Sequence, residues 1–422
     1  MKQILKASAT AALALTMTLI IFAPGASAAE DFTIQNPYED VNWSANTPRR
    51  TQLHTHTNAS DGRQTMAEAL ENYYTAGYDF VAFTDHGVVD RGWVKPNYWF
   101  FENYFGGIIF GGRKPIVGLT EERLKEMSGG VGRDGRGMHR VPYGIEQNPQ
   151  GPRIEVNSWF ADWGHGFVGG DKDYEIAVGN VSRKGGLCMI NHPSNSSYNG
   201  GLSLEDIYEG NNNYYVNKVQ RLFEKYPALI GLEIPEDRDR KLWDILLANL
   251  APAGRSVFGV ATSDSHDADT IDKRWVWALM PESTVENLRN SLEAGAFFSV
   301  IRGDNTKVEP MVTEITVENN AITITAENHA LIQWISDGNV IATGNTLDLV
   351  SNKSKLGAYV RAEVSGEGGV LYTQPFLLSY EGMPEGKPVP SDFVDWGRLV
   401  GWLRMLMYPF FWSFDQLWEW VR

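Results

Sequence analysis

The chain of 422 residues contains one cysteine, Cys188, and therefore cannot form an internal disulfide bond. It also lacks any run rich in lysine or arginine, and its formal net charge is −15. Proteins that bind nucleic acid usually present a basic face that neutralises phosphates, so this composition argues against a nucleic-acid partner. Stability must come from packing, for which a hydrophobic content of 43% is sufficient.

Long apolar runs are scarce apart from one near the start, from Ala7 to Ala23. Two lysines precede this run, and the small-residue triplet Ala26-Ser27-Ala28 follows it. These features favour a signal peptide over residues 1–28 and disfavour a retained membrane anchor. We therefore expect a secreted or cell-envelope protein whose mature chain, without the two lysines, carries a formal charge of −17.

Between residues 48 and 301, short apolar runs alternate with helical patterns, which indicates β-α units around a parallel sheet. About seven such units favour a closed barrel, so we expect an α/β barrel domain over residues 29–303. The expected helices are Met66–Ala76, Arg240–Leu250 and Thr284–Ala294. The expected strands are Thr51–Thr55, Phe80–Thr84, Arg140–Ile145, Leu187–Ile190, Leu229–Ile234, Val257–Thr262 and Trp275–Met280.

One long insertion, from Arg91 to His139, is rich in glycine and aromatic residues. Insertions that follow barrel strands often build the mouth of an active site, which would make this segment a lid or a pocket wall. A surface subdomain that packs its aromatic side chains internally is an equal alternative.

The pattern changes after Gly303. Short alternating strands with turn residues predict a β-sandwich over residues 304–380, followed by a linker over 381–391 rich in Gly and Pro. Residues 392–422 have the apolar spacing of an amphipathic helical tail that is kinked at Pro409. Its longest uncharged run, Met405–Phe414, is too short to span a membrane. The tail could make peripheral membrane contact, or pack on its own barrel or on a second subunit.

Histidines and acidic residues recur where the expected strands end. A single histidine in such a place is more often structural than a ligand. Several at successive strand ends would gather at one face of a barrel, as metal ligands must. The residues are His54 and His56, followed by Asp61-Gly62; Asp85-His86; His165; His192; and Asp264-x-His266.

These motifs, in the order His54-Thr55-His56, Thr84-Asp85-His86-Gly87, Asn191-His192-Pro193 and Ser263-Asp264-Ser265-His266, resemble those of the polymerase and histidinol phosphatase (PHP) family. The resemblance covers residues 48–303 and implies a distorted (β/α)7 barrel with up to three clustered metal ions. It further implies three ligand sets, with Glu146 bridging two of them and Glu155 as a rival for that role. The sets are His54, His56, Glu146 and Asp264; Glu146, His165 and His192; and Asp61, His86 and His266.

Imidazole and carboxylate ligands suit two or three divalent ions of zinc, manganese or iron. Such ions would generate hydroxide near neutral pH and stabilise anionic oxygen, so we expect a metal-dependent phosphoesterase acting on a small-molecule ester. Arg274 and Arg140 could bind a phosphate oxygen, although surface ion pairs are the commoner role for such arginines. Glu233 could approach the site without being a ligand.

Two other functions remain open. One is a hydrolase of carboxyl or carbamate esters that uses the same metal cluster, an activity found in a branch of the PHP family. The other is a non-catalytic protein that binds the cell envelope through the sandwich and the tail.

Overall fold

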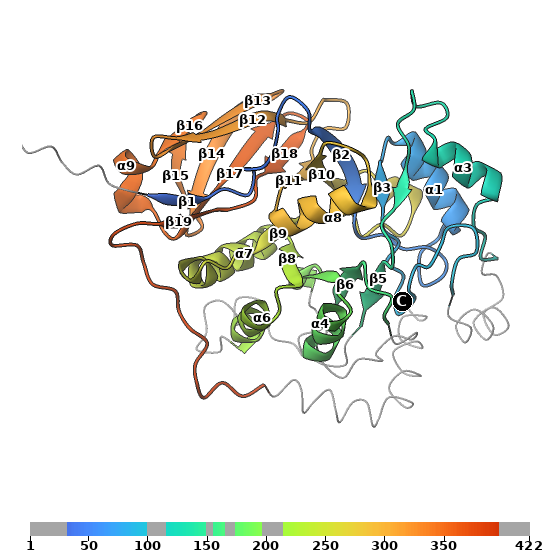
Figure 1. The fold of residues 1–422 in the computed structure, drawn as a ribbon, viewed down its shortest axis with the longest axis horizontal. Helices are drawn as coiled ribbons and strands as arrows, with labels where there is room; N and C mark the ends of the chain where they lie inside the picture. The colour runs from blue at the N-terminus through green and yellow to red at the C-terminus, as the bar shows by residue number, and fades with distance from the viewer. Residues whose placement is uncertain (1–31, 99–114, 149–154, 165–173, 196–213, 396–422) are drawn as a thin grey trace, which may run out of the picture. The chain divides into compact units, whose positions relative to one another are not determined.

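The computed structural model describes residues 32–98, 115–148, 155–164, 174–195 and 214–395. Figure 1 shows strands along almost the whole described chain, with helices between many of them. Within the described residues the strands form three sheets.

A five-stranded sheet has the order β5-β6-β7-β8-β9. Its strands are β5 (Ile145–Gln147), β6 (Val156–Trp159), β7 (Leu187–Ile190), β8 (Leu229–Glu233) and β9 (Phe258–Val260). Every residue in these strands is buried, as expected for a sheet covered on both faces. Strands β7, β8 and β9 are parallel, whereas β6 runs antiparallel to both β5 and β7.

The largest sheet, of eleven strands among the described residues, joins two regions that the sequence pattern separates. Its first part contains β2 (Thr47–Gln52), β3 (Phe80–Val81), β4 (His139–Arg140), β10 (Arg274–Met280) and β11 (Phe297–Arg302). Its second part contains β18 (Gly369–Tyr372), β17 (Tyr359–Gly366), β19 (Phe376–Ser379), β1 (Thr33–Gln35), β14 (Leu331–Ser336) and β15 (Asn339–Thr343). Strand β11 pairs with β18 and so connects the two parts.

A third sheet contains β12 (Met311–Glu318), β13 (Ala321–Glu327) and β16 (Thr346–Asp348). Asn319 and Asn320, between β12 and β13, have φ values of 50° and 61°, as a tight two-residue hairpin turn requires. The inner face of this sheet shares one hydrophobic core with β14, β17 and β18 of the large sheet, through residues that include Ile315, Ile324 and Trp334. Residues 304–380 thus contain two packed layers of strands, one of which continues into the sheet of the preceding region.

The helices are α1 (Met66–Thr75), α3 (Glu121–Ser128), α4 (Tyr174–Arg183), α6 (Tyr214–Lys225), α7 (Asp237–Leu250), α8 (Val285–Ala294) and the short α9 (Leu349–Asn352). Helix α1 begins at a capping box, in which the Thr65 hydroxyl accepts from the Glu68 amide and the Glu68 carboxylate accepts from the Thr65 amide. Helix α8 ends at Gly295, whose φ of 75° favours glycine. The three helices expected from the sequence are therefore present.

The expected mixed α/β fold is confirmed, but a closed (β/α)7 barrel is not found among the described strands. The two sheets meet through isolated bridges between His86 and Glu146 and between Thr55 and Ser265, and not through continuous pairing. Strand β10 is antiparallel to its neighbours β2 and β11, in contrast to the parallel order expected. Apolar runs predict buried strands, but they do not determine strand direction or closure.

Part of the predicted C-terminal tail, residues 396–422, lies outside the described residues, as do residues 1–31. Residues 381–395 contain no helix or strand, as expected for a linker. No helix within the described residues is both long and apolar enough to cross a membrane.

Candidate metal centre

The end of strand β2 places His54 and His56 beside the loop that follows β9. The side chain of Gln52 holds this junction together: its oxygen accepts from the amides of His54 and Ser263, at 3.2 and 3.3 Å, and its nitrogen donates to the Arg274 carbonyl at 3.1 Å. The His56 amide also donates to the Ser265 carbonyl at 2.8 Å. Both histidines are almost completely buried.

Asp264, in the loop after β9, has a φ of 46°. This left-handed conformation is unfavourable for residues other than glycine, although aspartate tolerates it better than most, and such strain is often found at functional sites. The carboxylate oxygen Oδ1 lies 3.2 Å from Nε2 of His54 and 3.2 Å from Nε2 of His56. The loop geometry thus aims this carboxylate at the histidine pair.

Four ligand atoms converge at this point. His54 Nε2 is 3.0 Å from His56 Nε2 and 3.3 Å from Oε2 of Glu146, and His56 Nε2 is 3.1 Å from the same oxygen. With Asp264 they bring two imidazole nitrogens and two carboxylate oxygens together from three separate parts of the chain. This is the set that the sequence resemblance implies for one metal ion.

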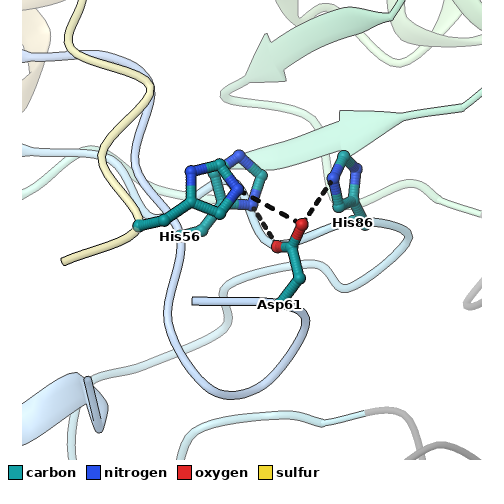
Figure 2. Close-up of side chains that lie close together, drawn as sticks. His56, Asp61 and His86 are labelled. Atoms are coloured by element: carbon teal, nitrogen blue, oxygen red, sulfur yellow. Dashed lines mark hydrogen bonds and ion pairs between the residues drawn. The ribbon is translucent and has the colours of Figure 1, made fainter. Parts of the chain in front are cut away.

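A second set surrounds Asp61. Figure 2 shows its carboxylate between His56 and His86: Oδ1 lies 3.4 Å from His56 Nδ1, and Oδ2 lies 3.4 Å from His86 Nε2. His266 Nε2 is 3.2 Å from the same Oδ2. Nitrogens and oxygens of all four residues fall within 4.8 Å of one another, which is close enough to surround one ion.

The loop that returns Asp61 to the site depends on Asp85 and Gly62. Asp85 accepts from the Thr57 amide and hydroxyl at 2.7 and 2.8 Å and from the Ser60 hydroxyl at 2.7 Å. A Cβ atom on Gly62 would lie only 2.7 Å from the carbonyl carbon of His56, so the loop can close this tightly only with glycine there. Within the Asp85-His86 motif, the aspartate therefore shapes the loop and the histidine faces the site.

A third set contains Glu146, Glu155 and His192. His192 Nε2 lies 3.7 Å from Glu146 Oε1 and 3.5 Å from Glu155 Oε2. His165, which the sequence places in this set, lies outside the described residues. Glu155 was expected only as a rival of Glu146, yet the structure brings both residues to the cluster.

Neighbouring side chains hold these groups in place. The side-chain NH₂ group of Asn191 donates to Oε1 of Glu146 at 2.6 Å and to the Asn157 side-chain oxygen at 3.0 Å. Glu155 directly precedes β6. Because β6 runs antiparallel to β7, the start of β6 lies beside the end of β7, and Glu155 therefore reaches the site. The antiparallel direction of β6 is not evident from sequence, which is why Glu155 was not recognised as part of this set.

Electrostatic coupling in the cluster is strong. Burial alone would lower the pKa of His56, but Asp61, Asp264 and Glu146 outweigh it and raise that pKa to about 9. Burial likewise opposes the charged form of His192, and hydrogen bonding to Glu146 leads the effects that raise its pKa to about 10.

The carboxyl groups respond in the opposite sense. Burial would raise the pKa of Glu146, but His86 and His54 hold it well below its usual range. Glu155 differs, because burial together with the charge of Glu146 raises its pKa. Without cations, the groups among the described residues of the cluster that can compensate the ionised carboxylates are protonated imidazoles.

The chemistry of this donor set fits divalent cations. Five carboxylates lie among five imidazoles, and imidazoles must be neutral to bind a metal. Neutral imidazoles would leave the buried negative charge uncompensated, which is costly unless cations balance it. The acidic groups are Asp61, Glu146, Glu155, Glu233 and Asp264; the imidazoles are His54, His56, His86, His192 and His266.

The order of the histidine and aspartate motifs and the convergence of these residues in space agree with the sequence resemblance to the PHP family. A similar solved structure is a two-domain protein from Bacteroides vulgatus that contains a predicted PHP-like metal-dependent phosphoesterase. It has 13% sequence identity, a TM-score of 0.41, and coverage of 81% of this chain and 90% of that chain.

Two further structures are more distant. The lesion-specific endonuclease EndoQ from Pyrococcus furiosus shares 12% identity, with 58% of this chain and 56% of that chain covered and a TM-score of 0.36. An amidohydrolase from Chromobacterium violaceum shares 14% identity, with 52% and 89% covered and a TM-score of 0.30. No protein-family model and no curated protein matches the sequence.

The two arginines expected to bind a phosphate oxygen have protein partners in the structure. Arg274 Nη2 lies 3.3 Å from Oε1 of Glu236. Arg140 donates to the Asp90 carbonyl at 2.8 Å and lies 3.8 Å from its carboxylate. These contacts are of the ion-pair kind named as the alternative, and a role in substrate binding stays a prediction for both residues.

Proposed function

We propose that the protein is a metal-dependent phosphoesterase that acts on a small-molecule ester. The observation that carries the proposal is that Nε2 of His54 and Nε2 of His56 each lie 3.0 to 3.3 Å from one another and from a carboxylate oxygen of Glu146 and of Asp264, beside the second set around Asp61. We expect two or three cations of zinc, manganese or iron, because the donors are imidazole and carboxylate.

When bound, such cations acidify a water nucleophile and stabilise negative charge on a phosphoryl oxygen. The residues of the chain hold and orient the centre. The side-chain NH₂ group of Asn191 positions Glu146, and the loop that Asp85 holds by hydrogen bonds positions Asp61. Preorganised ligands of this kind avoid the cost of rearrangement during the reaction.

A phosphate ester is favoured over a neutral ester by charge. Divalent cations held at this site would place positive charge beside the reacting group, which suits an anionic phosphate ester better than a neutral carboxyl or carbamate ester.

A substrate panel tests the proposal. The protein, loaded with Mn²⁺ or Zn²⁺, is assayed with p-nitrophenyl phosphate, bis-p-nitrophenyl phosphate, p-nitrophenyl acetate and single-stranded DNA, and bound metal is counted by elemental analysis. We expect turnover of a phosphate ester and no cleavage of DNA. Turnover of the acetate alone would replace this proposal with the carboxyl ester hydrolase, and stoichiometric metal without turnover would favour a binding protein.

Variants show whether turnover arises at this centre. Asp264→Asn removes a ligand charge, and we expect kcat/KM to fall by on the order of 100-fold or more, since loss of a residue that merely supports a ligand already costs roughly 10- to 100-fold. His329→Ala is a matched control, because His329 lies between β13 and β14, outside the cluster. Equal activity of Asp264→Asn and the parent would show that turnover comes from another site.

A further inference from the structure

Glu233, the last residue of strand β8, is a buried carboxylate whose two oxygens are both engaged. Oε1 lies 2.7 Å from Nδ1 of His54 and accepts from the Thr262 hydroxyl. Oε2 accepts from the backbone amide of His192 at 2.7 Å. Glu233 is 1% exposed, so water does not compete for these contacts.

The two nitrogens of His54 therefore face different surroundings. Nδ1 faces Glu233, whereas Nε2 faces His56, Glu146 and Asp264 at 3.0 to 3.3 Å. A neutral imidazole carries one proton, and a carboxylate oxygen can only accept it in a hydrogen bond. A proton held on Nδ1 by Glu233 leaves the lone pair of Nε2 directed at the other ligand atoms.

We propose that Glu233 is a positioning residue that fixes the tautomer and ring orientation of His54 and so prepares Nε2 for metal binding. This inference rests on the proposed metal centre. Carboxylate–histidine pairs of this kind orient metal ligands and make the imidazole more basic.

Glu233 also connects His54 to two other strand ends. Its contact with the His192 amide fixes the chain where β7 ends, and its contact with Thr262 fixes the loop two residues before Asp264. One carboxylate thus sets the relative positions of ligands that follow β2, β7 and β9.

The geometry favours this role over direct ligation by Glu233. His54 Nδ1, His192 and Glu233 could form a ligand group by distance alone. However, Oε1 already has two partners and Oε2 accepts from a backbone amide that cannot move away. The ligand atoms of His56, Glu146 and Asp264 lie on the Nε2 side of the imidazole ring, opposite the nitrogen that faces Glu233.

Glu233→Gln gives the most direct test. The amide keeps the size of the side chain and can still accept from one donor, but its NH₂ group would donate to Nδ1. This interaction would favour the tautomer with the proton on Nε2, which blocks metal binding at that atom. We expect roughly 10- to 100-fold weaker binding of Co²⁺ and shifted visible absorption bands, in keeping with the loss of a residue that supports a ligand.

The matched control is Asp244→Asn, another buried carboxylate-to-amide change. Asp244 pairs with Arg361 and accepts from the Tyr359 hydroxyl, and it has no contact with the histidines. Each stripped protein is titrated with Co²⁺ by calorimetry and by absorption spectroscopy. We expect Asp244→Asn to unfold at a lower temperature than the parent while keeping the affinity and the absorption bands of the parent.

The outcomes separate the two proposals. If the parent binds no divalent cation, the metal centre and the role of Glu233 are both wrong. If the parent binds Co²⁺ and Glu233→Gln binds it with the same affinity and spectrum, only the role of Glu233 is wrong.

A measurement on the parent protein covers the case in which Glu233→Gln does not fold. Long-range ¹H–¹⁵N correlation of the Zn²⁺-loaded protein should place the His54 proton on Nδ1 and the metal on Nε2. The reverse assignment would refute the inference without any variant.

Discussion

Asp90 should make the protein less stable as the pH rises, and Asp90→Asn should remove that effect. The side chain is 4% exposed, and its carboxylate accepts from the Gly92 amide at 2.9 Å. Burial raises the pKa of Asp90 to about 7, against the lowering influence of Arg140 and of the Gly92 amide. Asparagine keeps the acceptor oxygen and the size of the side chain, but it does not ionise.

The sign follows from proton binding. Between the ordinary pKa of 3.8 and the folded value of about 7, the folded protein holds a proton that the unfolded chain has lost. Stability from this group is therefore complete below pH 4 and is lost as the pH rises to 7. At about 1.4 kcal/mol per unit, the change from pH 5 to pH 8 amounts to about 3 kcal/mol as an upper figure.

Urea unfolding of the metal-stripped protein at pH 5, 6, 7 and 8 measures this effect. The quantity compared is the difference in unfolding free energy between Asp90→Asn and the parent at each pH, since the histidine cluster is common to both and cancels. We expect the unfolding free energy of the variant, relative to that of the parent, to increase by about 3 kcal/mol from pH 5 to pH 8. A difference that stays constant from pH 5 to pH 8 would refute the reasoning.

Three other changes have defined outcomes. Gly62→Ala would place a methyl group 2.7 Å from the His56 carbonyl carbon and displace the loop, so we expect roughly 100-fold lower kcat/KM. Gly92→Ala is the control: no atom lies within 4 Å of its new methyl group, so kcat/KM should stay unchanged. Asp244→Asn removes one of the two carboxylates that pair with the buried Arg361 guanidinium and leaves Glu363, so it should cost about 3 kcal/mol in urea unfolding, the lower end for breaking a buried pair; a loss below 1 kcal/mol would contradict this. Removing the cations with a chelator should lower the melting temperature, since ligand at about 100 times its Kd contributes about 2.7 kcal/mol. Restoring Mn²⁺ should reverse the effect, and an unchanged melting temperature would argue against a bound metal.

Much of the candidate site could be predicted because its residues occur beside recognisable strands. His192 and Asp264 each follow a buried apolar run, His54 follows the more polar strand β2, and the ends of such strands lie on one side of the sheet. The prediction needed only residue types and spacing. The structure then brings these residues within ligand distance of one another.

Strand β6 shows what the sequence pattern does not reveal. Its residues include Asn157 and Ser158, both completely buried, so the segment lacks the apolar run that marks the neighbouring strands β7 and β8. Their polar groups are satisfied inside the protein: the Asn157 amide donates to the side chain of Asn191, and the side chain of Gln147 donates to the Ser158 hydroxyl. Partners of this kind come from distant parts of the chain and cannot be identified from local sequence.

The expected closed barrel is not found among the described strands for a related reason. The expected strand Trp275–Met280 corresponds to β10, which spans Arg274–Met280, but its antiparallel pairing with β2 depends on long-range contacts. Hydrophobic spacing indicates which residues are buried, whereas the direction of a strand follows from the path of the chain between elements.

The pairing of β11 with β18 affects how the protein can be divided. A fragment that ends after Gly303 would lose the neighbour of β11 and leave four residues, Ser299 to Arg302, with open hydrogen-bonding groups along an unprotected edge. Expressed alone, such a shortened chain would be prone to self-association, even though every metal-binding candidate is present in it. The strands that follow residue 303 thus cover an edge that the metal-binding region would otherwise leave open.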